Sequence, residues 1–469
     1  MQPKMRRIAR ALARGGVSVD RAGGVWTLQK HGAEARILLP DSLPLERKAV
    51  DQLLALASVR HPLGGRTCQC IATPDFHPGD GGIAIGSVVY TEGMVIPSAV
   101  GRDINCGMRL HVLDLSRDRF EAHRDRLVAL LKGDYLLGTR DIVLHRDHLR
   151  ATLHDGLAGL ADVPIPFRGA LANVDREQLW DELDRVYDQG GRPGDAAWLP
   201  DDLLDREWRR DPVLGTIGGG NHFVEILEVA EVMDTRTAYR WGVRPDQLAF
   251  MIHSGSRTVG KAIGDAWKRR TRAEWPRGVP MPDVLSIHAE SPACAAYLEA
   301  ENTAANFGWL NRFVLAETMR RRVREVFGDV ASPLVFDLPH NLTERRGVGF
   351  VTRKGACPAH PGQPVIIPGS MGASSFLMEG QGNPHFLESA SHGAGRAVTR
   401  FELGRRGSRF TDDHTLGLDG VTCITLKEER RIEEAPAAYK PIGPVIEAQV
   451  DARVVRPIAR LEPLLTFKG

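Results

Sequence analysis

The stretch Gly101-Arg102-Asp103-Ile104-Asn105-Cys106-Gly107-Met108 follows an apolar, strand-like run and places an aspartate three residues before a cysteine. A hard carboxylate oxygen and a soft sulfur at this spacing can bind one metal ion together or contact two ions. The glycines on both sides let the backbone come close to a bound ion. The alternative is a tight turn followed by a buried cysteine, and this stretch alone favours that alternative. The rest of the chain has to decide between the two.

Three histidines stand at other predicted strand ends. His222 opens a strand after a glycine-rich segment, whereas His253 and His340 close two short apolar strands. Strand ends are where α/β proteins assemble sites from segments that are distant in sequence. A cluster of imidazole, thiolate and carboxylate groups selects a transition metal. The four junctions therefore predict a metal site that combines these histidines with Asp103 and Cys106.

The composition is that of a globular protein with nearly balanced charge. The chain has 469 residues, 42% of them apolar and 26% charged, and a formal net charge of +2. This balance excludes a globally basic nucleic-acid coat but leaves room for a local basic channel. The sequence shows no apolar run long enough to span a bilayer and no signal peptide, so we expect a cytoplasmic protein without a membrane partner. Its six cysteines are irregularly spaced, unlike a secreted disulfide framework.

The periodicity and the charge density of the sequence differ between its segments. Residues 1–64 have the periodicity of a small α/β segment. Residues 116–210 are dense in charge and predict a helical insertion or lid packed on a sheet. Its helices are expected from Ser116 to Leu131 and from Arg176 to Gln189.

Glycine-rich turns in the second half suit phosphate binding. Gly218–Gly220 frees backbone N–H groups to face an anion, and the small-residue turn Pro368–Met371 offers N–H groups and a hydroxyl. His392-Gly393-Ala394-Gly395-Arg396 leaves its histidine open on one side and is followed by Arg400. The alternative for His392 is a capping residue at a helix N-terminus. Asp75 lies in a turn-rich loop, where an aspartate is more often a turn former than a catalytic residue.

Together these motifs resemble those of the RtcB family of RNA ligases, over residues 65–469. The motifs that carry the resemblance are Pro74 to Gly79, Gly101 to Met108, Gly218 to Glu225, His253 to Arg257, His340-Asn341, Arg353 to Ala356, Pro368 to Gly372, His392 to Arg396, Ala438-Tyr439-Lys440 and Lys468-Gly469. Phe76 and Arg102 depart from the residues usual in the family, which indicates a divergent member. The resemblance implies an α+β fold with one large catalytic domain over residues 65–469. That domain would have central β-sheets, a metal site at the strand ends and a helical insertion over residues 116–210.

The resemblance also implies a reaction. Members of the family use GTP and Mn²⁺ to join an RNA 3′-phosphate or 2′,3′-cyclic phosphate to a 5′-hydroxyl, in tRNA splicing or RNA repair. His392 would form a covalent histidine–GMP, and the RNA would pass through an RNA-3′-pp-5′-G intermediate. One Mn²⁺ would be held by Asp103, Cys106 and His222, and the second by Cys106, His253 and His340. The residues implied to line the guanine nucleotide are Asn221, His222, Phe223, Val224, Glu225, His340, Asn341, Pro368, Gly369, Ser370, Met371, Ser375, His392, Gly393, Ala394, Gly395 and Lys468.

Two further roles are hypotheses from residue chemistry. Asp75 is expected to orient His392, because a carboxylate can hold one ring nitrogen while the other reacts. Arg257, Arg396 and Arg400 are expected to contact RNA phosphates, since the planar guanidinium group suits phosphate.

Two other classes of protein fit part of the pattern. A binuclear metal phosphoesterase would use the same ligands to activate water, but it does not need His392 in an open glycine-rich loop. A non-catalytic protein that binds RNA ends is disfavoured mildly by the small net charge and more strongly by the complete ligand set. The sequence leaves open the physiological RNA, the oligomeric state, an activating protein partner and the replacement of manganese by another divalent ion.

Overall fold

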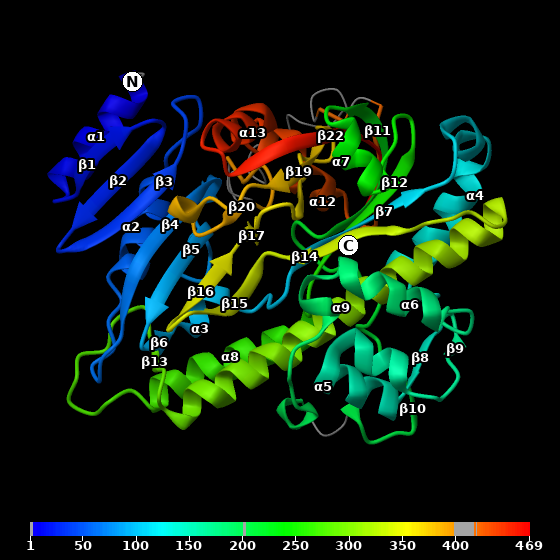
Figure 1. Cartoon of the computed structure of the whole chain (residues 1–469), viewed down its shortest axis with the longest axis horizontal. Helices are drawn as coiled ribbons and strands as arrows, with labels where there is room; N and C mark the ends of the chain where they lie inside the picture. The colour runs from blue at the N-terminus through cyan, green and yellow to red at the C-terminus, as the bar shows by residue number, and fades with distance from the viewer. Residues whose placement is uncertain (1–2, 200–202, 398–416, 419) are drawn as a thin grey trace.

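The computed structural model describes residues 3–199, 203–397, 417–418 and 420–469 of the chain (Figure 1). The α-helices of that part are α1 (Pro3–Arg14), α2 (Arg47–Ala57), α3 (Pro97–Val100), α4 (Arg117–Leu136), α5 (Arg146–Asp162), α6 (Arg176–Glu182), α7 (Thr235–Arg240), α8 (Arg257–Ala273), α9 (Pro292–Phe327), α12 (Glu428–Glu433) and α13 (Ile442–Asp451). The strands of its first half are β1 (Ser18–Ala22), β2 (Val25–Lys30), β3 (Ala33–Leu38), β4 (Arg66–His77), β5 (Ile85–Glu92), β6 (Met94–Val95), β7 (Gly107–Leu113), β8 (Ile142–His145), β9 (Arg168–Gly169), β10 (Trp208–Arg210) and β11 (Phe223–Val232). Those of its second half are β12 (Leu248–Ser254), β13 (Ile287–His288), β14 (Leu334–Pro339), β15 (Asn341–Arg346), β16 (Gly349–Lys354), β17 (Ala356–Pro358), β18 (Pro364–Ile367), β19 (Ser375–Gly380), β20 (Ser389–Ser391), β21 (Thr422–Thr425) and β22 (Val455–Lys468). The fold is α+β with central sheets, as the sequence predicted.

One central sheet has the strand order β1-β2-β3-β4-β5-β16-β15. Its N-terminal strands lie at the blue end of Figure 1 and join the rest of the sheet through the parallel pair β3 and β4. Helix α2 buries Leu53, Leu54 and Leu56 in the same apolar core that holds Phe76 of β4 and Val89 of β5. Residues 1–64 therefore share a sheet and a core with the residues that follow, and the boundary at residue 64 remains a prediction.

The other central sheet has the order β14-β7-β12-β11-β22-β19-β18, with β21 beside β22. Strands β14, β7, β12 and β11 pair antiparallel, so that the start of each strand lies beside the end of its neighbour. Gly107 at the start of β7 lies opposite Pro339 at the end of β14, and His253 near the end of β12 lies opposite Phe223 at the start of β11. Four junctions from distant parts of the sequence thus meet at one edge of the sheet.

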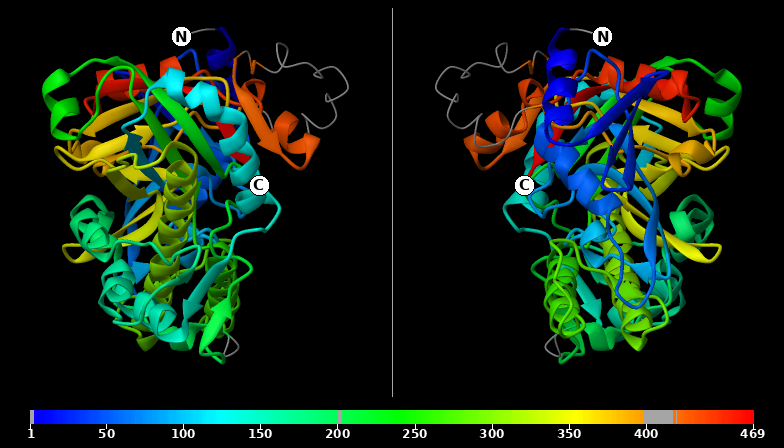
Figure 2. Two further views of the ribbon diagram at one scale, coloured as in Figure 1. Left: turned by 90° about the vertical axis from the view of Figure 1, so that its right-hand side faces the viewer. Right: turned by 90° about the vertical axis from the view of Figure 1, so that its left-hand side faces the viewer.

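Helix α9 is 36 residues long and runs through the lower half of Figure 1. At 1.5 Å per residue it spans about 54 Å. It packs against α4, α5 and α8, with the central sheets on one side of it and α5 and β8–β10 on the other (Figures 1 and 2). Asn306 on α9 accepts a hydrogen bond from Arg192 N at 2.9 Å and donates one to Leu153 O at 2.9 Å, which attaches the segment 116–210 to the helix.

The segment 116–210 contains helices and a three-stranded sheet of order β10-β8-β9. Ser116 caps α4, since its hydroxyl accepts a hydrogen bond from Arg119 N at 3.4 Å. The prediction of one helix from Arg176 to Gln189 was wrong in its second half. Helix α6 ends at Glu182, and Asp188 and Gln189 have φ values of 51° and 52°, which a right-handed helix does not allow.

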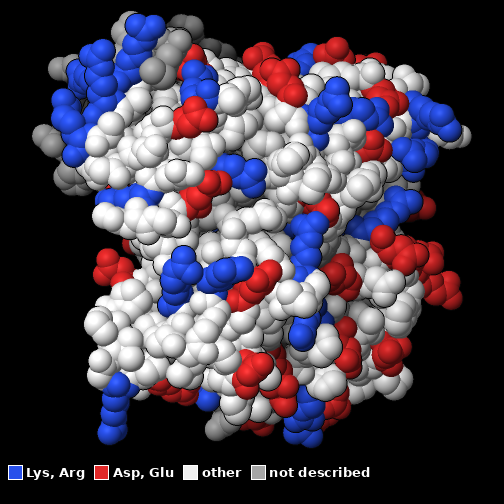
Figure 3. Space-filling model, turned by 60° about the vertical axis from the view of Figure 1, so that its left-hand side comes forward, with Lys and Arg blue, Asp and Glu red and all other residues white. Residues whose placement is uncertain are grey.

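Two bulk predictions can be compared with the structure. No helix in the described part of the chain has the length and apolar character needed to cross a bilayer. The six cysteines are all free thiols. On the face in Figure 3, acidic and basic side chains are interspersed, and basic side chains gather at the upper left beside the atoms drawn in grey.

Candidate metal and nucleotide site

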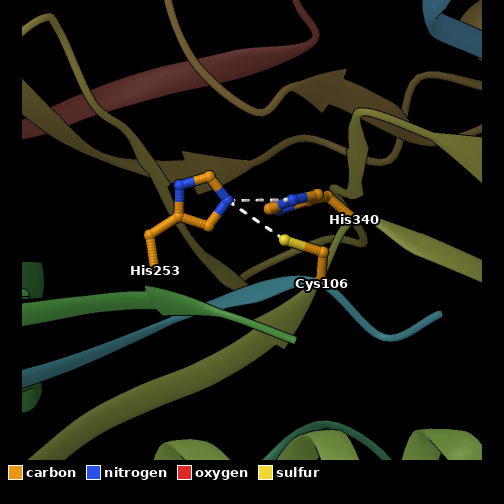
Figure 4. A group of neighbouring side chains, drawn as sticks. All are labelled: Cys106, His253 and His340. Atoms are coloured by element: carbon orange, nitrogen blue, oxygen red, sulfur yellow. Dashed lines mark hydrogen bonds between the residues drawn. The ribbon is translucent and has the colours of Figure 1, made fainter. Parts of the chain in front are cut away.

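Five potential metal ligands meet at the edge of the second sheet. Cys106 Sγ lies 3.1 Å from His222 Nε2 and 3.2 Å from His253 Nε2. His253 Nε2 lies 3.3 Å from His340 Nε2, and the side chains of these two residues and Cys106 point toward one another in Figure 4. His222 Nε2 lies 2.9 Å from Asp103 Oδ2. The ligand atoms form two groups of three, Cys106 with His253 and His340, and Asp103 with Cys106 and His222, each within 4.8 Å. Cys106 belongs to both groups.

The charge state of this cluster suits divalent cations. Burial lowers the pKa values of His253 and His340 well below the ordinary value, so both imidazoles are neutral. Burial raises the pKa of the Cys106 thiol, and the Asp103 carboxylate raises it further. A bound cation would lower the pKa of the Cys106 thiol again, because a metal stabilises the thiolate. The lone pairs of the neutral imidazoles could bind the same cation. Imidazole, thiolate and carboxylate together fit a transition metal.

Backbone hydrogen bonds hold the loop that carries Cys106. Asn105 has a φ of 51°, a left-handed conformation that asparagine tolerates. His340 N donates to Cys106 O at 2.8 Å, and Asn105 N donates to Asn341 O at 2.8 Å. The Asn341 side chain donates to Asp103 O at 2.9 Å. The loop is therefore fixed against the end of β14, which keeps His340 beside Cys106.

Arg312 of α9 holds the same loop from the opposite side. Its buried guanidinium group donates to Asn105 O at 2.6 Å, to Asn105 Oδ1 at 3.0 Å and to Ser254 O at 3.0 Å. The Asp337 carboxylate lies 2.8 Å away and balances its charge. Since an unpaired buried charge is very costly, this ion pair has to form for α9 and β14 to pack. Sequence reasoning gave Arg312 no role, although an arginine inside the apolar stretch Trp309–Phe313 is the signal that could have found it.

His392 lies beside the cluster and against Asp75. The His392 and His340 ring centroids are 4.8 Å apart. His392 Nδ1 lies 2.7 Å from Asp75 Oδ2, and His392 N donates to the same oxygen at 3.3 Å. His392 follows strand β20, so the alternative of a capping histidine at a helix N-terminus was wrong. With Nδ1 held by a carboxylate, Nε2 is the nitrogen that remains for chemistry.

Asp75 lies near the end of strand β4, so the prediction that it lies in a turn-rich loop was wrong, and its carboxylate is buried with several hydrogen bonds. Burial alone would raise its pKa, but hydrogen bonds and charge from His392 and a hydrogen bond from Thr73 hold that pKa below the ordinary value. Thr73 Oγ1 donates to Asp75 Oδ1 at 2.5 Å. The carboxylate is therefore ionised and accepts a hydrogen bond from His392 Nδ1–H.

Comparison with known proteins agrees with this geometry. Residues 52–469 match a family model described as tRNA-splicing ligase RtcB. The chain belongs to the RtcB family. It is 31% identical to the tRNA-splicing ligase RtcB of Thermococcus kodakarensis, over 95% of this chain and 97% of that protein. It is 35% identical to the RNA-splicing ligase RtcB of Mycobacterium tuberculosis, over 85% of this chain and 96% of that protein. The resemblance read from the motifs is thus confirmed.

The turn Pro368–Met371 lies next to His392 in this RtcB-family chain. It connects β18 to β19, and Gly369 N donates to Ser375 Oγ at 3.4 Å. A methyl group on Gly393 would lie 3.6 Å from Pro368 O, so the two loops adjoin. The structure thus brings two of the predicted nucleotide-binding segments together.

Lys468 connects the C-terminal strand to another of these segments. Its ammonium group lies 5.2 Å from the centre of the Phe223 ring and donates to Asn221 O at 3.3 Å. Burial lowers the pKa of Lys468 and raises the pKa of Glu225 to about 7. Val224 is fully buried among apolar residues, as alternation along β11 requires. The contacts of all these residues with a nucleotide remain predictions.

The three arginines assigned to RNA differ in their surroundings. Arg257 begins α8 beside the cluster of potential metal ligands, and its Nε donates to Thr216 Oγ1 at 3.2 Å. Arg396 Nη1 lies 3.2 Å from Glu434 Oε1, and its guanidinium group lies 5.3 Å from the centre of the Tyr439 ring. Arg400 lies outside the described residues. Of the two described arginines, Arg257 therefore lies beside the potential metal ligands Asp103 and Cys106, whereas Arg396 forms an ion pair with Glu434.

Proposed function

We propose that this protein is an RNA ligase that uses GTP and two Mn²⁺ ions to join an RNA 3′-phosphate to a 5′-hydroxyl. A 2′,3′-cyclic phosphate would first be opened by water to the 3′-phosphate. The observation that carries the proposal is the position of His392, held by Asp75 and in ring contact with the metal cluster. Membership of the RtcB family supports it.

The side chains account for the first step. His392 Nε2 attacks the α-phosphorus of GTP, the bond to the β-phosphate breaks, and pyrophosphate leaves. Asp75 keeps the proton on Nδ1 and stabilises the positive ring that forms. Asp103, Cys106 and His222 would hold one Mn²⁺, and Cys106, His253 and His340 the other. Bound Mn²⁺ would neutralise phosphate charge and stabilise the charge that develops at phosphorus.

Two transfers complete the proposed reaction. An oxygen of the RNA 3′-phosphate attacks the phosphorus of histidine–GMP, which gives RNA-3′-pp-5′-G and frees His392. The 5′-hydroxyl then attacks the RNA 3′-phosphate, and GMP leaves. Arg257, at the start of α8 and near Asp103 and Cys106, would contact a phosphate there.

A groove at the other end of α8 supports a polymeric substrate. The groove has a volume of about 740 Å³ and is lined by the cations Arg47, Lys48, Lys268 and Arg272, together with Asp51 and Asp283. Arg47 pairs with Asp51 at 2.9 Å, and the exposed side chains of the other three cations are available for phosphates. Because α8 begins at the metal cluster, an RNA strand that leaves the site along this helix would reach the groove.

The test is formation of a covalent protein–GMP. We expect α-labelled GTP and Mn²⁺ to label the wild-type protein in an acid-labile, alkali-stable bond, with release of pyrophosphate. His392→Ala should give no labelled protein, and the exposed His385→Ala, only a few residues away, should label normally. Absence of label together with phosphate release from model esters would instead indicate a binuclear phosphoesterase. Absence of both activities with RNA ends still bound would indicate a non-catalytic binding protein.

A further inference from the structure

Lys440 is a buried cation beside the end of strand β4, which carries Asp75. Its side chain is 2% exposed. Its Nζ donates to Pro74 O at 3.1 Å and to Phe76 O at 2.5 Å, the carbonyl groups on either side of Asp75. A lysine that donates to the carbonyl groups before and after one residue fixes the direction of the backbone between them.

The backbone of Lys440 holds the loop that carries His392. Lys440 N donates to Gly395 O at 2.9 Å, and Ala397 N donates to Ala438 O at 2.8 Å. Gly395 has a φ of 74°, and a methyl group there would lie 2.0 Å from Asp75 O. The loop of His392 is therefore in direct backbone contact with Asp75. Lys440 therefore bridges two segments: its main-chain N–H contacts the loop of His392, and its ammonium group contacts the end of β4 around Asp75.

The charge of Lys440 also stabilises the Asp75 carboxylate. Asp75 and Glu46 favour the charged form of Lys440, although burial lowers its pKa to about 8, so the side chain is a cation at neutral pH. The fully buried Asp75 carboxylate thereby has a buried counter-charge in addition to its hydrogen bonds. A carboxylate and an ammonium group that are desolvated together stabilise each other more than they would in water.

We infer that Lys440 is a positioning residue for guanylylation: it holds Asp75 at the angle from which this carboxylate orients the nucleophile His392. This inference rests on the proposed function. Lys440 takes no part in bond making, because its Nζ is occupied by the two carbonyl groups. It acts on the step in which the bond from His392 Nε2 to the α-phosphorus forms and pyrophosphate leaves.

The simpler alternative is that Lys440 only stabilises the fold. The reaction sequence separates the two roles. RNA that already carries a 3′-pp-5′-G end needs only attack by its partner's 5′-hydroxyl with loss of GMP, and this step does not use His392 as a nucleophile. A positioning role affects guanylylation alone, whereas a general structural defect affects both reactions.

The experiment compares Lys440→Met with the wild-type protein and with Lys132→Met, a change of an exposed lysine on α4. We expect Lys440→Met to form protein–GMP roughly 100-fold more slowly, because a catalytic group displaced by about 1 Å costs this much. The KM for GTP should stay close to the wild-type value, and joining of RNA-3′-pp-5′-G should continue at close to the wild-type rate. Lys132→Met should match the wild type in every assay.

Several outcomes would overturn the inference. Guanylylation of Lys440→Met at the wild-type rate would show that the bridge is unnecessary, and equal losses in both reactions would show a structural role only. If Lys440→Met does not fold, Lys440→Arg, which keeps the charge and two donors, should retain guanylylation while Lys440→Gln loses it. Equal activity of these two variants would then refute the inference. Failure of the wild-type protein to form any adduct would refute the proposed function itself.

Discussion

Asp75→Ala is expected to reduce guanylylation of His392 by about 10³-fold or more while manganese content remains at the wild-type level. Asp75 Oδ2 lies 2.7 Å from His392 Nδ1, so the carboxylate determines which ring nitrogen carries the proton. Loss of the corresponding carboxylate in a histidine-based catalytic site costs on this order, because the wrong tautomer cannot act. The five proposed metal ligands do not include Asp75, which is why metal binding should be spared.

The measurement is the rate of protein–GMP formation together with the ratio of manganese to protein after gel filtration. Asp75→Asn should be similarly slow, because an amide has no charge to stabilise the imidazolium ring. The matched control is Asp80→Ala, an exposed aspartate in the turn that follows β4, which should behave as wild type. Normal guanylylation of Asp75→Ala would contradict the assigned role, and loss of manganese would indicate that the change disturbs the metal cluster.

Cys106→Ala is expected to lower manganese binding at both sites, and Asp103→Ala chiefly at one. Cys106 Sγ belongs to both groups of ligand atoms, whereas Asp103 belongs only to the group with His222. Removing the thiolate would leave one group with two imidazoles, His253 and His340, and the other with only Asp103 and His222, so each proposed site would lose one of its three protein ligands and a negative charge. We expect close to zero bound manganese for Cys106→Ala and about one ion per chain for Asp103→Ala at the same free concentration.

Metal analysis after equilibrium dialysis and calorimetric titration measure this difference. Cys294→Ala is the control, because Cys294 is also a buried free thiol but is not in the cluster. Equal losses in the Cys106 and Asp103 variants would refute the shared ligand. Retention of two ions by Cys106→Ala would remove the thiolate from the site altogether.

The sequence predicted the position of the site, because the ends of apolar runs mark the ends of strands. Cys106, His222, His253 and His340 each stand where an apolar run begins or ends, and such junctions converge when strands pair antiparallel. The sequence did not show which strands are neighbours. The order β14-β7-β12-β11 depends on packing between segments that are far apart in the chain.

The residues that hold the site in place were harder to predict. Lys440 is 366 residues from Pro74, its hydrogen-bond partner, and no local pattern records such a pairing. Arg312 is 207 residues from Asn105 and lies on helix α9, most of whose buried residues are apolar. Buried cations are informative in retrospect, because a protein retains them only where partners compensate their desolvation. The break in the predicted helix was missed for a different reason, since Val186 adopts an extended conformation and forms a β-bridge with Asp337, which is distant in sequence.

The most direct measurement of the central claim follows one phosphorus atom. RNA carrying a labelled 3′-terminal phosphate is incubated with the protein, Mn²⁺, GTP and an RNA with a 5′-hydroxyl. We predict a longer RNA in which the label resists phosphatase, because the 3′-phosphate becomes the new phosphodiester, and no product without GTP or with His392→Ala. If the label is released as inorganic phosphate and the two RNAs are not joined, the assignment of this protein as a ligase is contradicted.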